Sequence, residues 1–271
     1  MRCVVVTGSF DDLRSHHVRF LEEAHKLGEL HLLLWSDETV RALGKEEKFP
    51  QTERLYYTKA IRYVSQVTLI KGTVEPDALP QVDGLQPDVW VVTQDEDNDR
   101  KRAYCASRGI EYRVLAPSDL EGFPVAEPSV SAGPARKKVI VTGCYDWFHS
   151  GHIRFFEETS ELGDLYVVVG HDENVRLLKG EGHPLFAQDE RRYMVQSIRF
   201  VTQALISSGQ GWMDAEPEIE RIQPDIYAVN HDGDKPEKRQ FCADHGLEYV
   251  VLQRRPKEGL TRRESTALRG F

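Results

Sequence analysis

Two histidines separated by a serine and a glycine, His149 and His152, are the side chains most clearly placed to do chemistry. Before them comes an apolar, β-branched run at residues 139–142, which predicts a buried strand, and then Gly143, which permits a tight turn. Helical spacing of apolar residues begins near Gly151. The N–H groups at a helix start are unpaired and carry partial positive charge, so such a junction attracts anions. Paired imidazoles there predict a phosphate-binding site.

This segment resembles the HxGH signature of the cytidylyltransferase-like nucleotidyltransferases, which join a phosphorylated small molecule to a nucleoside monophosphate. Residues 149–152 match the signature fully, and residues 142–146 fit the strand-to-loop segment that leads into it. The resemblance implies a Mg²⁺-dependent reaction between a nucleoside triphosphate and a small phosphorylated substrate, with no side chain singled out as a metal ligand. The nucleotide contacts that it implies in this segment come from Thr142, Gly143, Cys144, Tyr145 and Gly151.

Nucleotidyl transfer is an in-line displacement at the α-phosphorus, so positioning and charge neutralisation dominate its catalysis. Under this interpretation His149 and His152 donate to phosphate oxygens as charge moves to the leaving pyrophosphate. Lys179, expected in a loop at 178–182, is the third catalytic residue, because a point charge on a flexible stem suits phosphate binding. The alternatives are a pair of structural or surface histidines and an ordinary solvated lysine.

Two segments near the end of the chain resemble other nucleotide-binding elements of the family. Asp232 follows the fourth expected strand of the second half, where it could touch ribose, base or Mg²⁺, or cap the next helix. Ser265 and Thr266 open a last short helix with arginines nearby, as in a signature that contacts the triphosphate. A helix cap on a charged tail is the alternative for these two hydroxyls.

Arg191 and Arg199 lie on a helix expected to start near residue 188. Residues 199–201 resemble an arginine–aromatic–valine element of cytidylyltransferases, so Arg199 is assigned to the nucleotide, with a purely structural role as the alternative. Arg191, Asp146 and Trp147 are assigned to the phosphorylated substrate. Shaping of the turn by Asp146 and core packing of Trp147 are the alternatives.

The two halves of the chain repeat each other. Residues 5–11 match residues 140–146 at a shift of 135, and residues 86–88 answer residues 223–225 at a shift of 137. A repeat of this length indicates a duplicated domain. The stretch 117–136 has the proline-rich composition of a linker.

We therefore expect a domain at 1–116, a linker at 117–136 and a second domain at 137–271. In each half we expect strand, helix, strand, long loop, helix, strand, helix, strand, helix, strand. Continuous apolar runs such as residues 165–169 suit strands buried on both faces. The predicted fold class is α/β, with two tandem Rossmann-like domains, each a parallel sheet with helices on both faces.

The halves differ at the signature. Residues 149–152 align with Arg14, Ser15, His16 and His17, so the first half keeps only the second histidine and has histidine in place of the glycine. After residues 114–115 the first half runs directly into the linker, without a hydroxyl-and-arginine tail. We predict that the second half is catalytic and that the first is a degenerate copy kept for packing, dimerisation or regulation.

Composition narrows the class of protein. Lys and Arg number 35 against 44 Asp and Glu, a net charge of −9, which argues against a nucleic-acid or anionic-membrane binder. We expect no targeting or spanning segment, because the apolar run near the N-terminus is short. Four cysteines lack CxxC spacing, which favours a reduced cytoplasmic protein.

The tandem arrangement resembles that of ethanolamine-phosphate cytidylyltransferases. The sequence therefore favours a cytidylyltransferase that moves CMP from CTP to a small phosphorylated alcohol, amino alcohol or sugar and releases pyrophosphate. An adenylyltransferase that uses ATP is the second reading, and a non-catalytic nucleotide-binding scaffold is the third. A homodimer is compatible with each.

Overall fold

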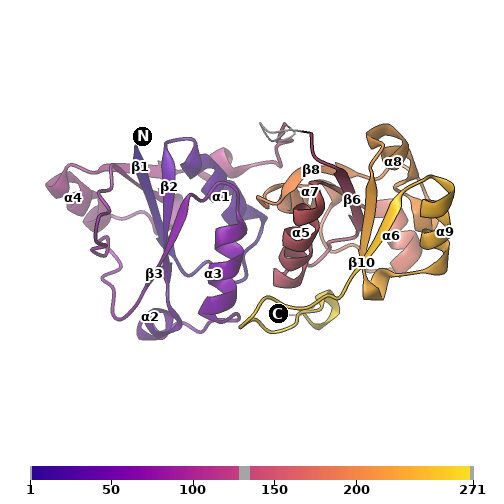
Figure 1. Cartoon of the computed structure of the whole chain (residues 1–271). Coiled ribbons are helices and arrows are strands. Elements are labelled where there is room, and N and C mark those ends of the chain that lie inside the picture. The colour runs from indigo at the N-terminus through magenta and orange to yellow at the C-terminus, as the bar shows by residue number, and fades with distance from the viewer. Residues whose placement is uncertain (1, 128–134, 269–271) are drawn as a thin grey trace. The chain divides into compact units, whose positions relative to one another are not determined.

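The computed structural model describes residues 2–127 and 135–268, apart from the side chains of residues 266 and 267. The chain divides into two compact units, Met1–Gly122 (unit 1) and Phe123–Phe271 (unit 2), so the division falls within the stretch expected as a linker. Two prolines of that stretch, Pro128 and Pro134, lie outside the described residues. Each unit contains one five-stranded parallel sheet with helices on both faces, which is the predicted fold class (Figure 1).

Unit 1 alternates strands with helices along the chain. Its strands are β1 (Cys3–Gly8), β2 (Glu29–Trp35), β3 (Gln66–Ile70), β4 (Val89–Thr93) and β5 (Glu111–Leu115). Its helices are α1 (Ser15–His25), α2 (Asp37–Ala42), α3 (Gln51–Ala60) and α4 (Asp99–Arg108), with 3₁₀ turns η1 (Gln94–Glu96) and η2 (Pro117–Leu120).

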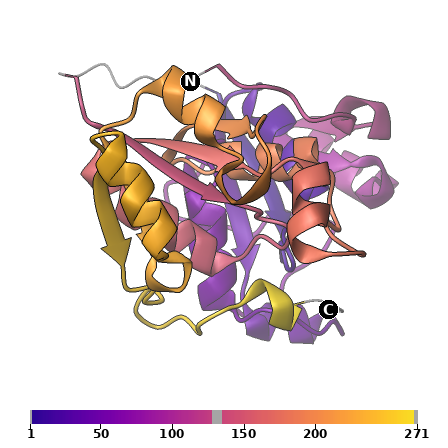
Figure 2. The same ribbon diagram turned by 90° about the vertical axis from the view of Figure 1, so that its right-hand side faces the viewer.

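Unit 2 repeats this order with one more helix. Its strands are β6 (Lys138–Gly143), β7 (Asp164–Val169), β8 (Val201–Ile206), β9 (Ile226–Asn230) and β10 (Glu248–Leu252). Its helices are α5 (Ser150–Leu162), α6 (Asp172–Lys179), α7 (Gln188–Gln196), α8 (Glu216–Ile222) and α9 (Pro236–Asp244), with 3₁₀ turns η3 (Gly211–Met213), η4 (His231–Gly233) and η5 (Ser265–Leu268). In Figure 2 the segment after β10 is the yellow ribbon that leads to the last short turn.

The strand order creates the crevice in which a ligand can bind. The sheet of unit 2 runs β10-β9-β6-β7-β8, so the chain changes direction across the sheet between β6 and β9. These two strands pair only at Val139 and Ile140, and their carboxyl ends are not joined. Ligands of open α/β sheets bind in the crevice at such a switch point.

Apolar strands hold the two layers of helices in place. One face of the unit 2 sheet, which includes Ile140 and Tyr227, packs against Ile219 of α8 and Cys242 of α9. Because successive side chains in a strand point to opposite faces, the intervening residues face the other layer. There α5 contacts β6 and β7, and α7 contacts β7 and β8.

Three local expectations were wrong. Arg199 does not share a helix with Arg191, because α7 ends at Gln196. Lys179 does not lie in a loop but is the last residue of α6, and the loop begins at Gly180. Unit 1 has no described helix between β3 and β4, although the repeat predicted one at the position of α8. The corresponding residues 79–85 include Gly84, whose φ is +77°, a left-handed conformation that interrupts a helix.

The described part of the chain contains no helix with the length and apolar character needed to cross a bilayer.

The turn between α5 and β7 depends on a glycine. A Cβ atom on Gly163 would lie 2.0 Å from the carbonyl oxygen of Lys137, which accepts the N–H of Asp164 at 2.8 Å. We expect Gly163→Ala to lower the free energy of unfolding by about 1–3 kcal/mol, as overpacking does. Urea denaturation measures the loss. Gly233→Ala is the matched control, because its nearest neighbour would lie 3.9 Å away; an equal loss in both variants would contradict this reading.

Candidate active site

A pocket of about 270 Å³ opens at the carboxyl edge of the unit 2 sheet, between the ends of β6 and β9 and the start of α5. It brings together residues that the sequence places far apart, from the strand ends, the end of α6, the loop after β9 and the tail after β10. The predicted site residues that line it are Thr142, Gly143, Cys144, Tyr145, Asp146, Trp147, His149, Gly151, His152, Lys179, Asp232 and Ser265.

Both signature histidines cap helix α5. His149 is the N-cap residue, and its Nδ1 accepts the N–H of Gly151 at 3.0 Å. The Nδ1 of His152 accepts the N–H of His149 at 3.4 Å, which completes a reciprocal capping box. The two rings stack with centroids 4.0 Å apart. The same backbone groups that make a helix start attractive to anions therefore also fix both imidazoles.

The caps determine which nitrogen carries the proton. A neutral imidazole has one donor and one acceptor nitrogen, so a ring whose Nδ1 accepts an N–H carries its hydrogen on Nε2. Nε2 of His149 is buried and has no hydrogen-bond partner among the described residues. It is thus a donor held ready beside the pocket.

Burial keeps both rings neutral. It lowers the pKa of His149 to about 3, with further lowering by the charges of Arg254 and Arg263. The pKa of His152 is also lowered well below its usual value, first by burial and then by His149, Arg254 and Lys179. Each neutral ring can therefore donate its one N–H to a phosphate oxygen, and neither ring has to become a positively charged imidazolium.

Gly151 leaves room for the imidazole of His149. A Cβ atom at this position would lie 2.8 Å from Cε1 and 2.9 Å from Nδ1 of that ring. The packing against this ring is a reason for glycine in addition to the nucleotide contact expected of Gly151. A side chain here would displace the first histidine.

Tyr145 forms a wall behind the histidines. Its φ is +53°, which folds the ring back over Gly143, where a Cβ atom would lie 2.8 Å from the ring. The ring meets His152 edge-on with centroids 5.3 Å apart. A small residue at the end of β6 thus allows an aromatic ring to support the second histidine.

Lys179 and Cys144 both line the pocket, and their side chains interact. Burial raises the pKa of the Cys144 thiol, and the positive charges of Lys179 and Arg191 partly offset that effect. The thiol therefore stays protonated at neutral pH, which argues against a thiolate nucleophile. The ammonium of Lys179 adds positive charge where phosphates would lie.

The segment after β10, here called the tail, lines part of the pocket through Arg254 and Ser265. The hydroxyl of Ser265 donates to the carbonyl oxygen of Trp147 at 3.2 Å, which attaches the tail to the signature loop. Asp232 forms an ion pair with Arg254, so this carboxylate holds an arginine at the pocket. The side chain of Thr266 lies outside the described residues.

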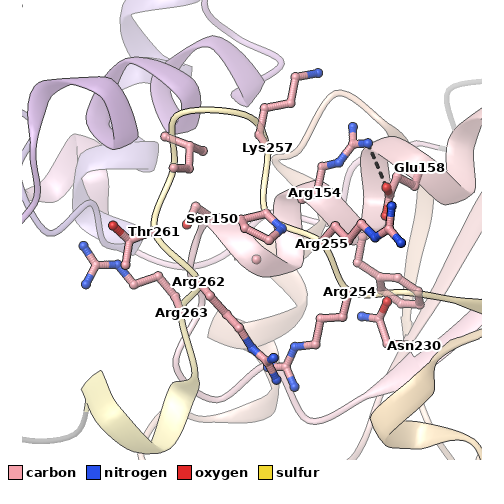
Figure 3. Close-up of a pocket in the computed structure, with 14 residues that line it drawn as sticks. Ser150, Arg154, Glu158, Asn230, Arg254, Arg255, Lys257, Thr261, Arg262 and Arg263 are labelled. Atoms are coloured by element: carbon pink, nitrogen blue, oxygen red, sulfur yellow. Dashed lines mark hydrogen bonds and ion pairs between the residues drawn. The ribbon is translucent and has the colours of Figure 1, made fainter.

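A second, small cavity lies next to the pocket and is strongly basic. It shares Gly151, Asn230 and Arg254 with the larger pocket. In Figure 3, Arg154 is paired with Glu158 on α5, at 2.7 Å between Nη2 and Oε1. Cations from the tail outnumber that carboxylate around the cavity, namely Arg254, Arg255, Lys257, Arg262 and Arg263. The two cavities together make an acidic protein locally attractive to a polyanion.

Two arginines assigned to ligands do not line either cavity. Arg191 is 1% exposed, and its guanidinium donates to three backbone carbonyls, including Cys144 O at 2.6 Å, and to Asp172. It therefore holds the loops that form the pocket rather than a substrate. Arg199 lies just before the amino end of β8, at the edge of the sheet opposite the pocket.

Asp146 also has a structural task. Its Oδ1 accepts the N–H groups of Leu185 and Phe186 at 2.7 and 3.1 Å, and its Oδ2 lies 3.4 Å from Nδ1 of His183. The carboxylate lines the pocket but is largely engaged by the loop after α6. Trp147 lines the pocket with its ring against that of Phe186, 5.5 Å between centroids.

Sequence reasoning missed four polar residues that line the pocket, namely His183, Asn230, Lys238 and Arg254. Arg254 follows the last strand directly, so its place at the carboxyl edge was a usable signal. Lys238 lies in the first turns of α9, and burial lowers its pKa. His183 belongs to the loop whose path depends on Asp146.

A magnesium cage made by the protein does not follow from this arrangement. The described residues contain no cluster of three or more His, Cys, Asp or Glu side chains that could hold a metal ion. The two carboxylates in the pocket, Asp146 and Asp232, are engaged by backbone N–H groups and by Arg254. Mg²⁺ usually keeps several waters and is bound through one or two carboxylates plus substrate phosphates, and that mode is the one the pocket can accommodate.

Comparison with known proteins agrees with this geometry. The model of the family described as Cytidylyltransferase-like matches residues 5–110 and 140–260, one segment in each unit. The chain therefore belongs to the cytidylyltransferase-like family.

The relatives named FAD synthase and HldE match over less than half of this chain. An FAD synthase of Ferroglobus placidus is 34% identical over 125 residues, which are 45% of this chain and 78% of that protein. The bifunctional protein HldE of Campylobacter concisus is 35% identical over 42% of this chain and 24% of its own length. A lipopolysaccharide core biosynthesis protein of Thermoplasma volcanium aligns in structure over 43% of this chain and 96% of its own, with 24% identity and a TM-score of 0.38.

The lowered pKa of His149 predicts a pH dependence of stability. The unfolded ring binds a proton near pH 6.5 and the folded ring only near pH 3, so protonation favours the unfolded chain as pH falls between these values. We expect His149→Asn, which keeps a cap acceptor, to reduce the stability loss between pH 7 and pH 5 by about 1–2 kcal/mol. Urea denaturation at the two pH values measures it; an unchanged loss in the variant would contradict the assignment.

Proposed function

We propose that unit 2 is a nucleotidyltransferase that transfers a nucleoside monophosphate from a nucleoside triphosphate to the phosphate of a small organic monoester. One observation carries the proposal. Two neutral imidazoles cap helix α5 and line a basic pocket, and the Nε2 of His149 is a buried donor without a partner among the described residues. Such an arrangement stabilises charge that develops on phosphate oxygens.

The reaction needs no covalent intermediate. An oxygen of the acceptor phosphate attacks the α-phosphorus, the bond to the bridging oxygen of the β-phosphate breaks, and pyrophosphate takes the electron pair. His149 and His152 donate from Nε2 to oxygens whose negative charge grows in the transition state. Because the rings are already neutral donors, no proton has to move before the displacement.

The cations around the pocket hold the phosphates. Lys179 approaches from the end of α6, and Arg254 approaches from the tail. The arginines around the small cavity in Figure 3 lie next to this point and add positive charge for the leaving pyrophosphate, although the cavity itself, at about 20 Å³, has room only for water. Bound Mg²⁺ would supply charge neutralisation of the triphosphate, and Asp232, now paired with Arg254, would be the pocket carboxylate to hold it.

We propose ATP as the first nucleotide and CTP as the second. The tandem arrangement and residues 199–201 were the reasons to favour CTP, and Arg199 lies away from the pocket. Relatives named FAD synthase add an adenylyl group to a flavin phosphate, as their name implies. FMN therefore joins phosphorylated alcohols, amino alcohols and sugars as an acceptor to be tested.

The decisive experiment is pyrophosphate release from each pair of ATP or CTP with a phosphorylated acceptor, in the presence of Mg²⁺. We expect turnover with at least one pair and a higher kcat/KM with ATP than with CTP for that acceptor. Removal of Mg²⁺ with EDTA should abolish it. Nucleotide binding without turnover on any pair would favour the scaffold reading instead.

A matched pair of substitutions tests which unit catalyses. His152→Ala and His17→Ala each remove a ring whose Nδ1 accepts a backbone N–H at the start of a helix. We expect the first to lower kcat by about 100- to 1,000-fold, as loss of a phosphate donor does, and the second to leave most of the activity. His149→Asn, which keeps the cap but lacks the donor Nε2, should behave like His152→Ala. The reverse pattern would assign catalysis to unit 1.

A further inference from the structure

Unit 1 has lost the signature but has kept a pocket. A cavity of about 500 Å³ opens at the carboxyl edge of its sheet, lined by the loop after β1, by Trp35 at the end of β2 and by the 3₁₀ turn after β4. It is larger than the pocket of unit 2, at about 270 Å³. A pocket of this size with a few polar groups is typical of a small-molecule site.

The loops around this cavity are held as firmly as those in unit 2. Arg54 is 2% exposed and donates to the carbonyl oxygens of Ser9, Trp35 and Phe49, and to Asp37. These contacts repeat those of Arg191.

A second anchor is repeated as well. Asp11 accepts the N–H groups of Lys48 and Phe49 at 2.6 and 3.0 Å, as Asp146 does in the other unit. The rim of the cavity is therefore preorganised although the signature is absent.

Of the two signature histidines, the second has a counterpart in this cavity, His17. Nδ1 of His17 accepts the N–H of Arg14 at 3.1 Å, so its Nε2 carries the hydrogen, and burial lowers the pKa of His17 to about 4. His17 thus offers a neutral donor at the wall of the cavity.

The features that would hold phosphates are replaced. Arg14 stands where the first histidine would be, and its guanidinium forms an ion pair with Asp12 at 2.6 Å. His16 fills the place of the glycine, and its ring lies tilted by 38° against that of His17 with centroids 3.9 Å apart. The described lining contains no arginine, and Lys45 is its only lysine.

The cavity also carries negative charge. Asp95 and Glu96 belong to the lining. A hydrogen bond from Thr93 lowers the pKa of Asp95, whereas burial raises that of Glu96, so Asp95 is the more firmly ionised of the two. In unit 2 the residue equivalent to Asp95 is Asp232, which is paired with Arg254. A triphosphate would therefore meet repulsion here.

The remaining walls are aromatic and aliphatic. Phe10, Phe20 and Trp35 contribute rings. Leu115 ends β5, and Pro117 and Leu120 follow it where the second unit has its basic tail. Such walls suit a planar ring, and carboxylates suit hydroxyl groups, which they accept as hydrogen-bond donors.

We propose that the unit 1 cavity binds an uncharged nucleoside, a planar nitrogen heterocycle that carries a sugar, and does not bind a nucleoside triphosphate. The heterocycle lies against Trp35 and Phe10, and the sugar hydroxyls donate to Asp95. This site is independent of catalysis in unit 2.

Equilibrium dialysis of the full chain with labelled adenosine or cytidine, in excess unlabelled ATP, tests the proposal. We expect one of the nucleosides to remain bound. Leu120→Trp places an indole in the cavity and should raise the dissociation constant at least about tenfold. Ser118→Trp is the matched control, because it adds the same group to an exposed position of the same turn and should change nothing.

Three results would overturn the proposal: no nucleoside retained, complete displacement by ATP, or equal binding in the two variants. If Leu120→Trp does not fold, fluorescence decides: a nucleoside should quench the natural chain, and Trp35→Phe should remove that quenching. Quenching that persists in Trp35→Phe, or none in the natural chain, contradicts the site. Pyrophosphate release is scored separately, so failure of the proposed transferase leaves these outcomes interpretable.

Discussion

The site depends on how helix α5 begins. Two backbone N–H groups at its first turn need acceptors, and both find them on imidazole nitrogens of the signature. Those two hydrogen bonds fix the orientation and the tautomer of each ring at once. The stacking of the rings and the contact of Tyr145 with His152 then restrict any other arrangement. Helix capping and phosphate recognition are served by opposite nitrogens of the same side chains.

A second interaction holds the loops in which this happens. The guanidinium of Arg191 joins the end of β6, the end of β7 and the loop before α7 through carbonyl oxygens. Arg54 makes the same contacts in unit 1, where the signature is absent. The arginine that holds the loops is therefore independent of the signature histidines, because unit 1 keeps the arginine although it lacks the full signature. A buried arginine with all its partners on the protein is a scaffold element, even within a few ångströms of a site.

Much of the fold could be predicted from the sequence. Continuous apolar runs identified the strands, and the repeat indicated two similar sheets, because both signals depend on local composition. The repeat predicted a helix between β3 and β4 of unit 1 that the structure does not have. The positive φ of Gly84 is incompatible with that helix, and the similarity between the halves does not reveal it. The position of Lys179 was also predicted wrongly, because α6 continues as far as Lys179 and the loop begins only at Gly180.

The site was predictable where its residues follow a strand directly. Thr142, His149 and Asp232 belong to segments at the carboxyl edge, and strand order brings such segments together. Arg191 was misjudged because a conspicuous arginine near a site has the same sequence signal whether it holds a ligand or a loop. The place of Arg254 at this edge could have been predicted from the end of β10, but its ion pair with Asp232 could not, because that pair depends on the path of the tail.

The attachment of the tail has a thermodynamic consequence. Ser265 joins it to the signature loop, Arg254 joins it to Asp232, and Lys257 joins it to Glu157 of α5, so few polar contacts hold the tail. A polyanion that touches both elements adds to those contacts, and linkage makes the effect mutual. Ligand occupancy should slow amide hydrogen exchange along residues 254–265, and shortening of the tail should weaken ligand affinity by the same free energy.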